Sequence, residues 1–231
     1  MDPRRTVVPF DPHHFEKLAR EGVTPTPDQI FRDIYLRHHW AGSASASGAG
    51  ADPDQIQHLR RTLPALLARL DVGTLLDLPC GDYSWMRTIE LPVRRYIGAD
   101  LLPELIEPLA AAHADAGHEF RVLDLTRDAL PAADLLLCRD CLVHLSYSDI
   151  RRALANIARS GIPLLLTTTF PAAADNEDIV TGDWRVLNLE CSPFDFPPPM
   201  ELLNEGCTEA GGRFADKSLG LWRIADLPRL D

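Results

Sequence analysis

Residues 74–82, TLLDLPCGD, decide the fold class, because a short apolar run there ends in a turn that holds two acids, a proline and a glycine. Further apolar runs follow along the chain: RYIGAD (95–100), FRVLDL (120–125), DLLLCRD (134–140), PLLLTTTF (163–170) and KSLGLWRI (217–224). Such runs are typical of buried strands, and the intervals between them can hold crossover helices. The alternation predicts an α/β fold with a doubly wound, parallel sheet.

The N-terminal part of the chain has helical periodicity instead. Residues 28–38 and 54–70 each place apolar side chains on one face, and Pro64 is expected to kink or split the second helix. Between them, residues 42–50 are rich in Ser, Ala and Gly, which predicts a mobile loop.

The best helical pattern in the C-terminal part covers residues 147–159. Ser146 and Asp149 resemble a capping box at its start, and Gly161 is placed to stop it. Residues 171–217 hold many prolines and are interpreted as a long insertion before the last strand, a kind of loop that tends to be functional.

Length and composition limit the organisation of the chain. With 231 residues, of which 45% are hydrophobic, the chain can bury one substantial core. We expect N-terminal helices and a lid loop at 1–70, followed by a catalytic domain at 71–231 with an acceptor-side insertion at about 171–217.

Charge and cysteine content narrow the function classes. A net charge of -11 argues against a nucleic-acid partner, which needs a basic face. No apolar run of about 18 residues and no apolar leader segment occurs, so we expect a cytoplasmic protein with no membrane partner. The five cysteines are an odd, scattered set, which favours reduced thiols over disulfides.

Acidic residues follow the first two predicted strands. In doubly wound sheets ligands bind beyond the carboxyl ends of the strands. Gly81 would let the backbone approach a ligand, and Asp77 and Asp82 are placed to contact a cationic amino-acid moiety. Asp100 is placed to accept hydrogen bonds from both hydroxyls of a ribose.

The next two strand ends are polar as well. Asp124 and Leu125 suit an adenine edge, and Arg139 and Asp140 lead to His144. Any one of these acids has a simpler explanation, that of a carboxylate capping the following helix. The G-x-G-x-x-G turn of a dinucleotide site is absent, which favours a ligand that carries a sulfonium and an ammonium group.

Residues 70–170 resemble the class I methyltransferases that use S-adenosylmethionine (SAM), with Asp77–Asp82 at the glycine motif and Asp100 at the acid after the second strand. The family usually has more glycines in this loop, where this chain has Pro79 and Cys80. The resemblance implies a mostly parallel, seven-stranded Rossmann-like sheet with an N-terminal helical lid. It also implies SAM as cofactor, bound by Trp40, Ser47, Asp77, Pro79, Gly81, Asp82, Asp100, Leu101, Asp124, Leu125 and Arg139.

The whole chain is similar to a bacterial subgroup, the sugar 1-O-methyltransferases of 3-O-methylmannose polysaccharide biosynthesis. The similarity rests on Phe31-x-x-Ile34-Tyr35, Trp40-x-Gly42, Ser47-Gly48-x-Gly50, DLPCGDYSWM, RDCLVHLS, LLTTTF and TGDWR-x-LNL. It implies a small saccharide acceptor, methylated on the 1-OH of a 3-O-methylated mannoside, and a homodimer is a further expectation. In this resemblance the Trp40–Gly50 loop closes over the cofactor, and residues 181–185 help bind the acceptor.

Transfer of a methyl group to a hydroxyl needs a base, because an unactivated sugar hydroxyl is a poor nucleophile at neutral pH. His144 is the best placed candidate, and Asp140, four residues earlier, would orient its imidazole if the segment between them is helical. These two residues are the predicted catalytic pair. The alternative is that His144 packs as a hydrogen-bonded core histidine.

Further side chains are predicted to contact the acceptor, because sugars are held by planar hydrogen-bonding groups and aromatic faces. These are Tyr147, Thr168, Thr169, Asp183, Trp184 and Arg185. For Trp184 and Arg185 the alternative is a loop anchored to the core.

A metal requirement stays open. Cys138 and Cys141 have the C-x-x-C spacing of zinc or redox sites, but no second ligand pair follows at the usual distance. A divalent cation such as Mg²⁺, held by carboxylates such as that of Asp140, remains an open expectation.

Three functions compete on this pattern. The leading hypothesis is a SAM-dependent sugar O-methyltransferase, or a methyltransferase of another small polyhydroxylated or natural-product acceptor. The others are a nicotinamide oxidoreductase, disfavoured by the missing glycine fingerprint, and a non-catalytic cofactor-binding protein.

Overall fold

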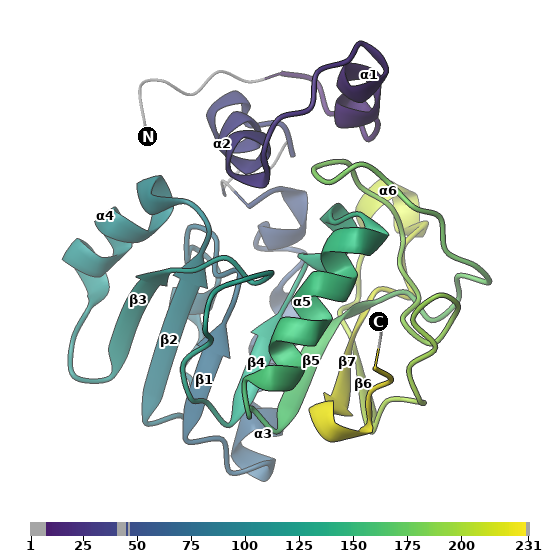
Figure 1. Ribbon diagram of the computed structural model, residues 1–231. Coiled ribbons are helices and arrows are strands. Elements are labelled where there is room, and N and C mark those ends of the chain that lie inside the picture. The colour runs from purple at the N-terminus through teal and green to yellow at the C-terminus, as the bar shows by residue number, and fades with distance from the viewer. Residues whose placement is uncertain (1–7, 41–44, 46, 230–231) are drawn as a thin grey trace.

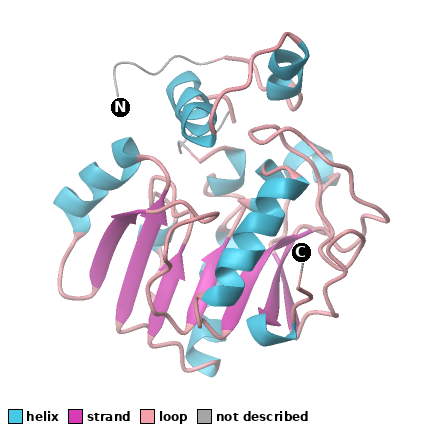
Figure 2. Cartoon of the chain, in the orientation of Figure 1, coloured by secondary structure: helices cyan, strands magenta, loops and turns pink. Residues whose placement is uncertain are grey.

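A seven-stranded sheet forms the centre of the molecule in the computed structural model, which describes residues 8–40, 45 and 47–229 (Figures 1 and 2). The strand order is β3-β2-β1-β4-β5-β7-β6. β1 to β5 pair in parallel, whereas β7 runs antiparallel to both β5 and β6. The strands are β1 (Thr74–Asp77), β2 (Arg95–Asp100), β3 (His118–Val122), β4 (Leu135–Cys138), β5 (Leu164–Thr169), β6 (Glu201–Asn204) and β7 (Ser218–Arg223). The predicted doubly wound, mostly parallel α/β sheet is confirmed.

The described helices are α1 (His14–Arg20), α2 (Pro27–Arg37), α3 (Gln57–Arg69), α4 (Pro103–His113), α5 (Tyr147–Arg159) and α6 (Glu209–Gly212). α5 begins as predicted, with the Ser146 side chain accepting a hydrogen bond from the Asp149 N–H at 3.2 Å. Gly161, with φ of 75°, follows its end. α1 had no counterpart in the sequence reading.

Both faces of the sheet are buried, and consecutive strand residues contribute to opposite sides. Leu75 of β1 packs in a cluster with the α3 residues Leu59 and Leu63. Leu76 packs in the other cluster, with the α5 residues Ile150 and Leu154. Figure 1 shows α5 lying across β4 and β5 on one face of the sheet.

Two sequence expectations are corrected by this architecture. α3 continues through Pro64 as one helix, because burial of four leucines at about 1.5–3 kcal/mol each outweighs the roughly 3 kcal/mol cost of an internal proline. The stretch 171–217, read as an insertion, contains β6, a four-residue edge strand with too little periodicity to recognise.

The N-terminal helices α1 and α2 lie above the carboxyl ends of the parallel strands (Figure 1). Phe15, Ile30 and Ile34 form a small buried cluster of their own between them. In the predicted 40–50 loop, residues 41–44 and 46, including Gly42 of the Trp40-x-Gly42 motif, lie outside the described residues.

In the described ranges, no helix combines the length and apolar character needed to cross a membrane.

Candidate active site

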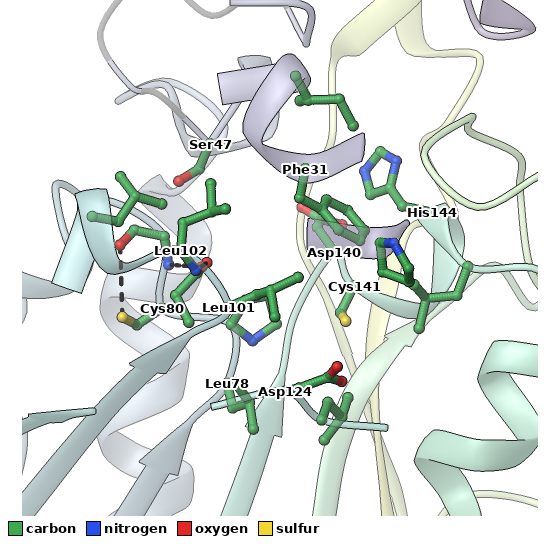
Figure 3. Close-up of a pocket in the computed structure, with 18 of the residues that line it drawn as sticks. Phe31, Ser47, Leu78, Cys80, Leu101, Leu102, Asp124, Asp140, Cys141 and His144 are labelled. Atoms are coloured by element: carbon green, nitrogen blue, oxygen red, sulfur yellow. Dashed lines mark hydrogen bonds between the residues drawn. The ribbon is translucent and has the colours of Figure 1, made fainter. Parts of the chain in front are cut away.

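A cavity opens at the carboxyl ends of β1 to β4, beneath α2 (Figure 3). We call it the strand-end cavity. Most of the predicted cofactor-binding residues line it, together with both predicted catalytic residues: Trp40, Ser47, Pro79, Gly81, Asp100, Leu101, Asp124, Leu125, Arg139, Asp140 and His144. Figure 3 shows Leu78 and Asp124 at the base of the cavity, with Ser47, Phe31 and His144 around it. Parallel strands end on the same edge, which explains why residues so far apart in the sequence meet here.

The turn after β1 brings the backbone close to the loop that precedes α3. Gly81 has φ of 56°, and a Cβ there would lie 2.0 Å from Oγ of Ser47. Ser45 Oγ donates to the carboxylate of Asp82 at 3.0 Å, so the described part of the loop is docked on this turn. Only glycine allows this close approach at residue 81.

Asp100, at the end of β2, presents an acceptor group to the cavity. Its two carboxylate oxygens accept hydrogen bonds from the N–H groups of Gly81 and Leu102, each at 3.2 Å. Burial raises the pKa of Asp100 to about 6, against the effect of these backbone hydrogen bonds. Above that pH it is a carboxylate with lone pairs left to accept from hydroxyl donors.

The far wall of the cavity is apolar with one acid. Leu101, Leu123 and Leu125 line it beside Asp124. Asp124 accepts hydrogen bonds from the backbone N–H of Thr126 at 2.8 Å and from its hydroxyl at 2.6 Å, so this carboxylate is held in place. Apolar walls with one fixed acceptor suit a flat heterocycle that carries an amino group.

Two of the predicted cofactor contacts are wrong in their role. Asp77 shares the face of Leu75, is 1% exposed, and accepts from the Tyr96 hydroxyl at 2.7 Å. Burial raises the pKa of Asp77 to about 7. Asp82 instead holds the loop through Ser45 and does not line the cavity.

Arg139 belongs to a buried ionic cluster that the sequence reading missed. The cluster consists of Arg139, Asp140, Glu205 and Lys217, which follow β4 and β6 or precede β7. Arg139 pairs with Glu205 at 2.7 Å and donates to the backbone carbonyl of Gly50 at 2.7 Å. Its charge is therefore balanced within the protein, and it holds the loop at Gly50. No local pattern marks Glu205 or Lys217.

The predicted hydrogen-bonded pair of Asp140 and His144 is not formed. Asp140 has φ of 52°, and Leu142–His144 is a short 3-10 turn, so the two side chains do not have the spacing of an α-helix. Asp140 instead accepts from Lys217 at 2.7 Å, and its backbone N–H donates to Thr168 at 2.8 Å. Burial alone would raise the pKa of Asp140, but the charges of Lys217 and Arg139 hold it well below its usual range.

His144 is held by a backbone carbonyl. Its Nδ1 lies 3.0 Å from the carbonyl oxygen of Asp183, which fixes Nδ1 as the donor and leaves Nε2 as an acceptor. Nε2 has no hydrogen-bond partner in the part of the chain that the structure describes. The ring stacks on Trp40 at 4.2 Å between centroids, and burial lowers its pKa to about 4. At neutral pH, His144 is therefore a neutral imidazole whose Nε2 carries no proton.

The predicted acceptor segment 181–185 is mainly a scaffold for His144. Arg185 donates to the carbonyls of Leu142 and Leu145, both at 2.9 Å, and so clamps the turn that carries His144. The Asp183 side chain accepts from the backbone of Phe15 at 2.8 Å and of Glu16 at 2.9 Å, at the start of α1. Neither side chain lines the strand-end cavity, and the hydrogen bonds described for both of them serve the fold.

Two more predicted acceptor contacts lie away from the cavities. Thr169 is fully buried, and its hydroxyl accepts from the Leu189 N–H at 3.2 Å. Tyr147 packs edge-on against Phe194 at 5.3 Å and lines neither described cavity. Thr168 supports Asp140, as described above.

A second cavity adjoins the first, and Trp184, which was predicted to contact the acceptor, lines it. We call it the aromatic cavity. It shares Trp40, Ser47, Asp140 and His144 with the strand-end cavity, and its other walls come from Phe10, Gly48, Ala49, Gly50, Phe170, Trp184, Cys207, Glu209, Phe214 and Lys217. The sequence reading missed most of these residues, since only Phe170 directly follows a strand.

Within the described ranges, no group of three or more His, Cys, Asp or Glu side chains is arranged to hold a metal ion. Cys138 is fully buried beside Cys141, whose pKa is raised by its hydrogen bond to Cys138 and by burial. These thiols are therefore poorly suited to redox or metal chemistry.

The fold is similar to that of several solved methyltransferases. Human N-acetylserotonin methyltransferase in complex with SAM has a TM-score of 0.56 at 16% identity, over 96% of this chain and 63% of that chain. The 1,6-didemethyltoxoflavin-N1-methyltransferase of Burkholderia thailandensis has a TM-score of 0.56 at 18% identity, over 92% and 90%. The N-methyltransferase NodS of Bradyrhizobium japonicum has a TM-score of 0.51 at 14% identity, over 72% and 97%.

No family model matches the chain, and no curated protein matches it in sequence. The chain spans less than two thirds of several of the solved chains it resembles, among them the human enzyme. At these identities the likeness establishes the fold alone.

Proposed function

We propose that the protein is a SAM-dependent O-methyltransferase. The observation that carries this proposal is the position of His144, a neutral imidazole with a bare Nε2, in the wall shared by the strand-end cavity and the aromatic cavity. A methyl donor in the strand-end cavity and a hydroxyl-bearing acceptor in the aromatic cavity would meet beside a base. Three structural neighbours with TM-scores above 0.5 are methyltransferases, which supports this use of the fold.

The strand-end cavity fits the proposed cofactor. Asp100 would accept from the ribose hydroxyls, Leu101 and Leu125 would cover the adenine faces, and Asp124 would accept from its amino group. The close approach at Gly81 leaves backbone rather than side chain beside the ligand. When bound, SAM supplies an electrophilic methyl group on a sulfonium.

The residues around His144 determine which of its ring nitrogens would accept a proton. The carbonyl of Asp183 holds Nδ1–H, so Nε2 is the only ring atom that accepts the proton of an attacking hydroxyl. Trp40 covers the imidazole face and excludes water from it. The carboxylate of Asp140 favours the protonated ring through its charge, without touching it. Asp140, which was predicted to orient the imidazole, therefore acts on His144 only through its charge.

For the acceptor, we propose a sugar hydroxyl, the 1-OH of a 3-O-methylated mannoside precursor of methylmannose polysaccharide. The sequence resemblance motivates this choice, and the alternative is another small polyhydroxylated or natural-product acceptor. The neighbours' names include an N-acetylserotonin and a toxoflavin-precursor methyltransferase, so the fold itself does not select among acceptors.

The test is calorimetric titration of the purified protein with SAM, S-adenosylhomocysteine (SAH) and NAD, followed by a methyl-transfer assay over partially methylated mannosides. We expect SAM and SAH to bind, NAD not to bind, and a methyl group to reach a mannoside. Binding of NAD alone would overturn the methyltransferase. Binding of SAM with transfer only to a different acceptor would keep the enzyme class and reject the mannoside.

A further inference from the structure

Three aromatic rings form one wall of the aromatic cavity. Trp184 lies edge-on to Phe214 at 5.0 Å and to Phe170 at 6.3 Å between centroids, and Phe170 and Phe214 are 6.1 Å apart. Phe170 is buried, but Trp184 and Phe214 are only half-buried. A half-buried tryptophan whose neighbours hold it rigid has a face left to cover a ligand.

Charged groups gather on the other side of this cavity, around the backbone of Gly50. A Cβ on Gly50 would lie 3.0 Å from Oδ2 of Asp140, 3.1 Å from Nζ of Lys217 and 3.5 Å from Oε1 of Glu209. Lys217 is committed to Asp140 at 2.7 Å. The Glu209 side chain accepts one described hydrogen bond, a long one of 3.8 Å from Sγ of Cys207, so its oxygens retain capacity to accept others.

The charge of this cavity selects against anions. Two carboxylates, Asp140 and Glu209, face one ammonium, Lys217, and His144 is neutral, which leaves a net charge of -1. A phosphate or carboxylate acceptor would be repelled there. A neutral ligand with several hydroxyl donors would instead find acceptors opposite an aromatic platform.

One donor at the shared wall also lacks a partner. Nε1 of Trp40 is buried and makes no hydrogen bond within the described residues. Trp40 lines both cavities and stacks on His144. An unsatisfied indole N–H costs free energy, and a ligand oxygen entering between the cavities would relieve that cost.

We infer that the aromatic cavity is the acceptor subsite and takes a neutral saccharide ring, with one ring face on Trp184 and hydroxyls directed to Glu209 and Asp140. This inference rests on the proposed function and adds the location of the acceptor subsite and Glu209 as a specificity residue. The hydroxyl nearest the shared wall then lies beside Nε2 of His144. Glu209 contacts the ligand at a distance from the reacting atoms, so it should affect acceptor binding and not the chemical step.

The experiment measures contact and turnover separately. Saturation-transfer NMR with the SAH-saturated protein probes binding of 3-O-methylmannose, and initial rates with the methylated mannosides give KM and kcat. Trp184→Ala should raise the acceptor KM about tenfold, and Trp184→Phe should restore most of that loss. Glu209→Gln should raise it about threefold to tenfold. In each variant, kcat should stay within about twofold and SAH should bind normally.

Glu201→Gln is the matched control, because Glu201 pairs with Arg69 on β6 outside both cavities. It should leave acceptor KM unchanged. Saccharide signals that persist unchanged in Trp184→Ala and Glu209→Gln would overturn the subsite, as would an effect of these variants on SAH affinity. Binding of a cationic amine in preference to the saccharide would overturn the ligand class. Failure of the wild-type protein to bind SAH would instead reject the proposed function.

Discussion

The strand-end cavity and the aromatic cavity share a wall but are assembled in different ways. The first is lined by residues at or shortly after the carboxyl ends of parallel strands, such as Gly81, Asp100 and Asp124. The second draws Phe10, Trp184 and Phe214 from irregular segments in separate parts of the chain. Sheet topology alone gathers the first set at one edge, whereas the second set depends on the path of long loops.

The pKa values of Asp100 and Asp140 differ because different groups contact the two carboxylates. Among the described residues, the hydrogen-bond donors to Asp100 are backbone N–H groups, and burial outweighs them and raises its pKa to about 6. Asp140, in the shared wall, has Lys217 and Arg139 beside it, and their charges lower its pKa well below its usual range. Two buried aspartates at the carboxyl ends of β2 and β4 therefore shift in opposite directions, and the tertiary contacts of Asp140 account for the difference.

The largest expected effect is at the shared wall. His144→Gln removes the base and should reduce kcat by about 100-fold or more, because general bases contribute roughly that much. SAH affinity should change less than about twofold, measured by calorimetry, if His144 serves the transfer and not cofactor binding. His58→Gln, an exposed position on α3, is the control. Full turnover in His144→Gln would contradict the proposal that His144 is the base for methyl transfer between the two cavities.

A smaller effect is expected within the strand-end cavity. Asp100→Asn should weaken SAH binding by about 10-fold to 100-fold, the value of one or two hydrogen bonds to a charged acceptor. Acceptor KM should remain near its wild-type value, which would separate the cavities by function. A loss of acceptor binding without a loss of SAH binding would reverse their assignment.

The same site predicts a pH dependence in the wild-type protein. The pKa of Asp100 is raised to about 6, so its ionised form is complete above roughly pH 7 and is lost as pH falls through 6. SAH affinity, measured by calorimetry from pH 8 to 5, should fall below pH 6 in the wild type, and this fall should be absent in Asp100→Asn, whereas a contribution from Asp77 would centre near pH 7 in both proteins. His144, with a pKa of about 4, stays neutral across this range, so it contributes nothing to the decline.

The smallest effect concerns the scaffold of the shared wall. Arg185→Met leaves the carbonyls of Leu142 and Leu145 without their donor and should lower the free energy of unfolding by about 1–3 kcal/mol in urea denaturation. Arg61→Met, on the exposed side of α3, should cost less than about 0.5 kcal/mol. If Arg185→Met raised acceptor KM at full stability, the original assignment of Arg185 to the acceptor would be restored.

The strand-end residues could be predicted because they need only two pieces of local information, the end of a strand and the residue type. The error at Asp77 shows the limit of that information. Strand residues alternate between faces, and an error of one position in judging where β1 ends moves a carboxylate from the cavity to the core. The error at Asp140 has a related cause, since a left-handed residue and a 3-10 turn replaced the expected helical turn.

The sequence by itself determined the succession of β1 to β5 and β7, the capped start of α5 and the gathering of Gly81, Asp100 and Asp124 at one edge. These follow from periodicity and residue type over a few neighbouring positions. Three contacts were decided only by the tertiary structure. The backbone carbonyl of Asp183 accepts a hydrogen bond from His144. Lys217 forms an ion pair with Asp140, and Glu205 forms one with Arg139. Each of these contacts joins residues at least 39 positions apart, and their pairing depends on burial and on where loops return, which local patterns do not encode.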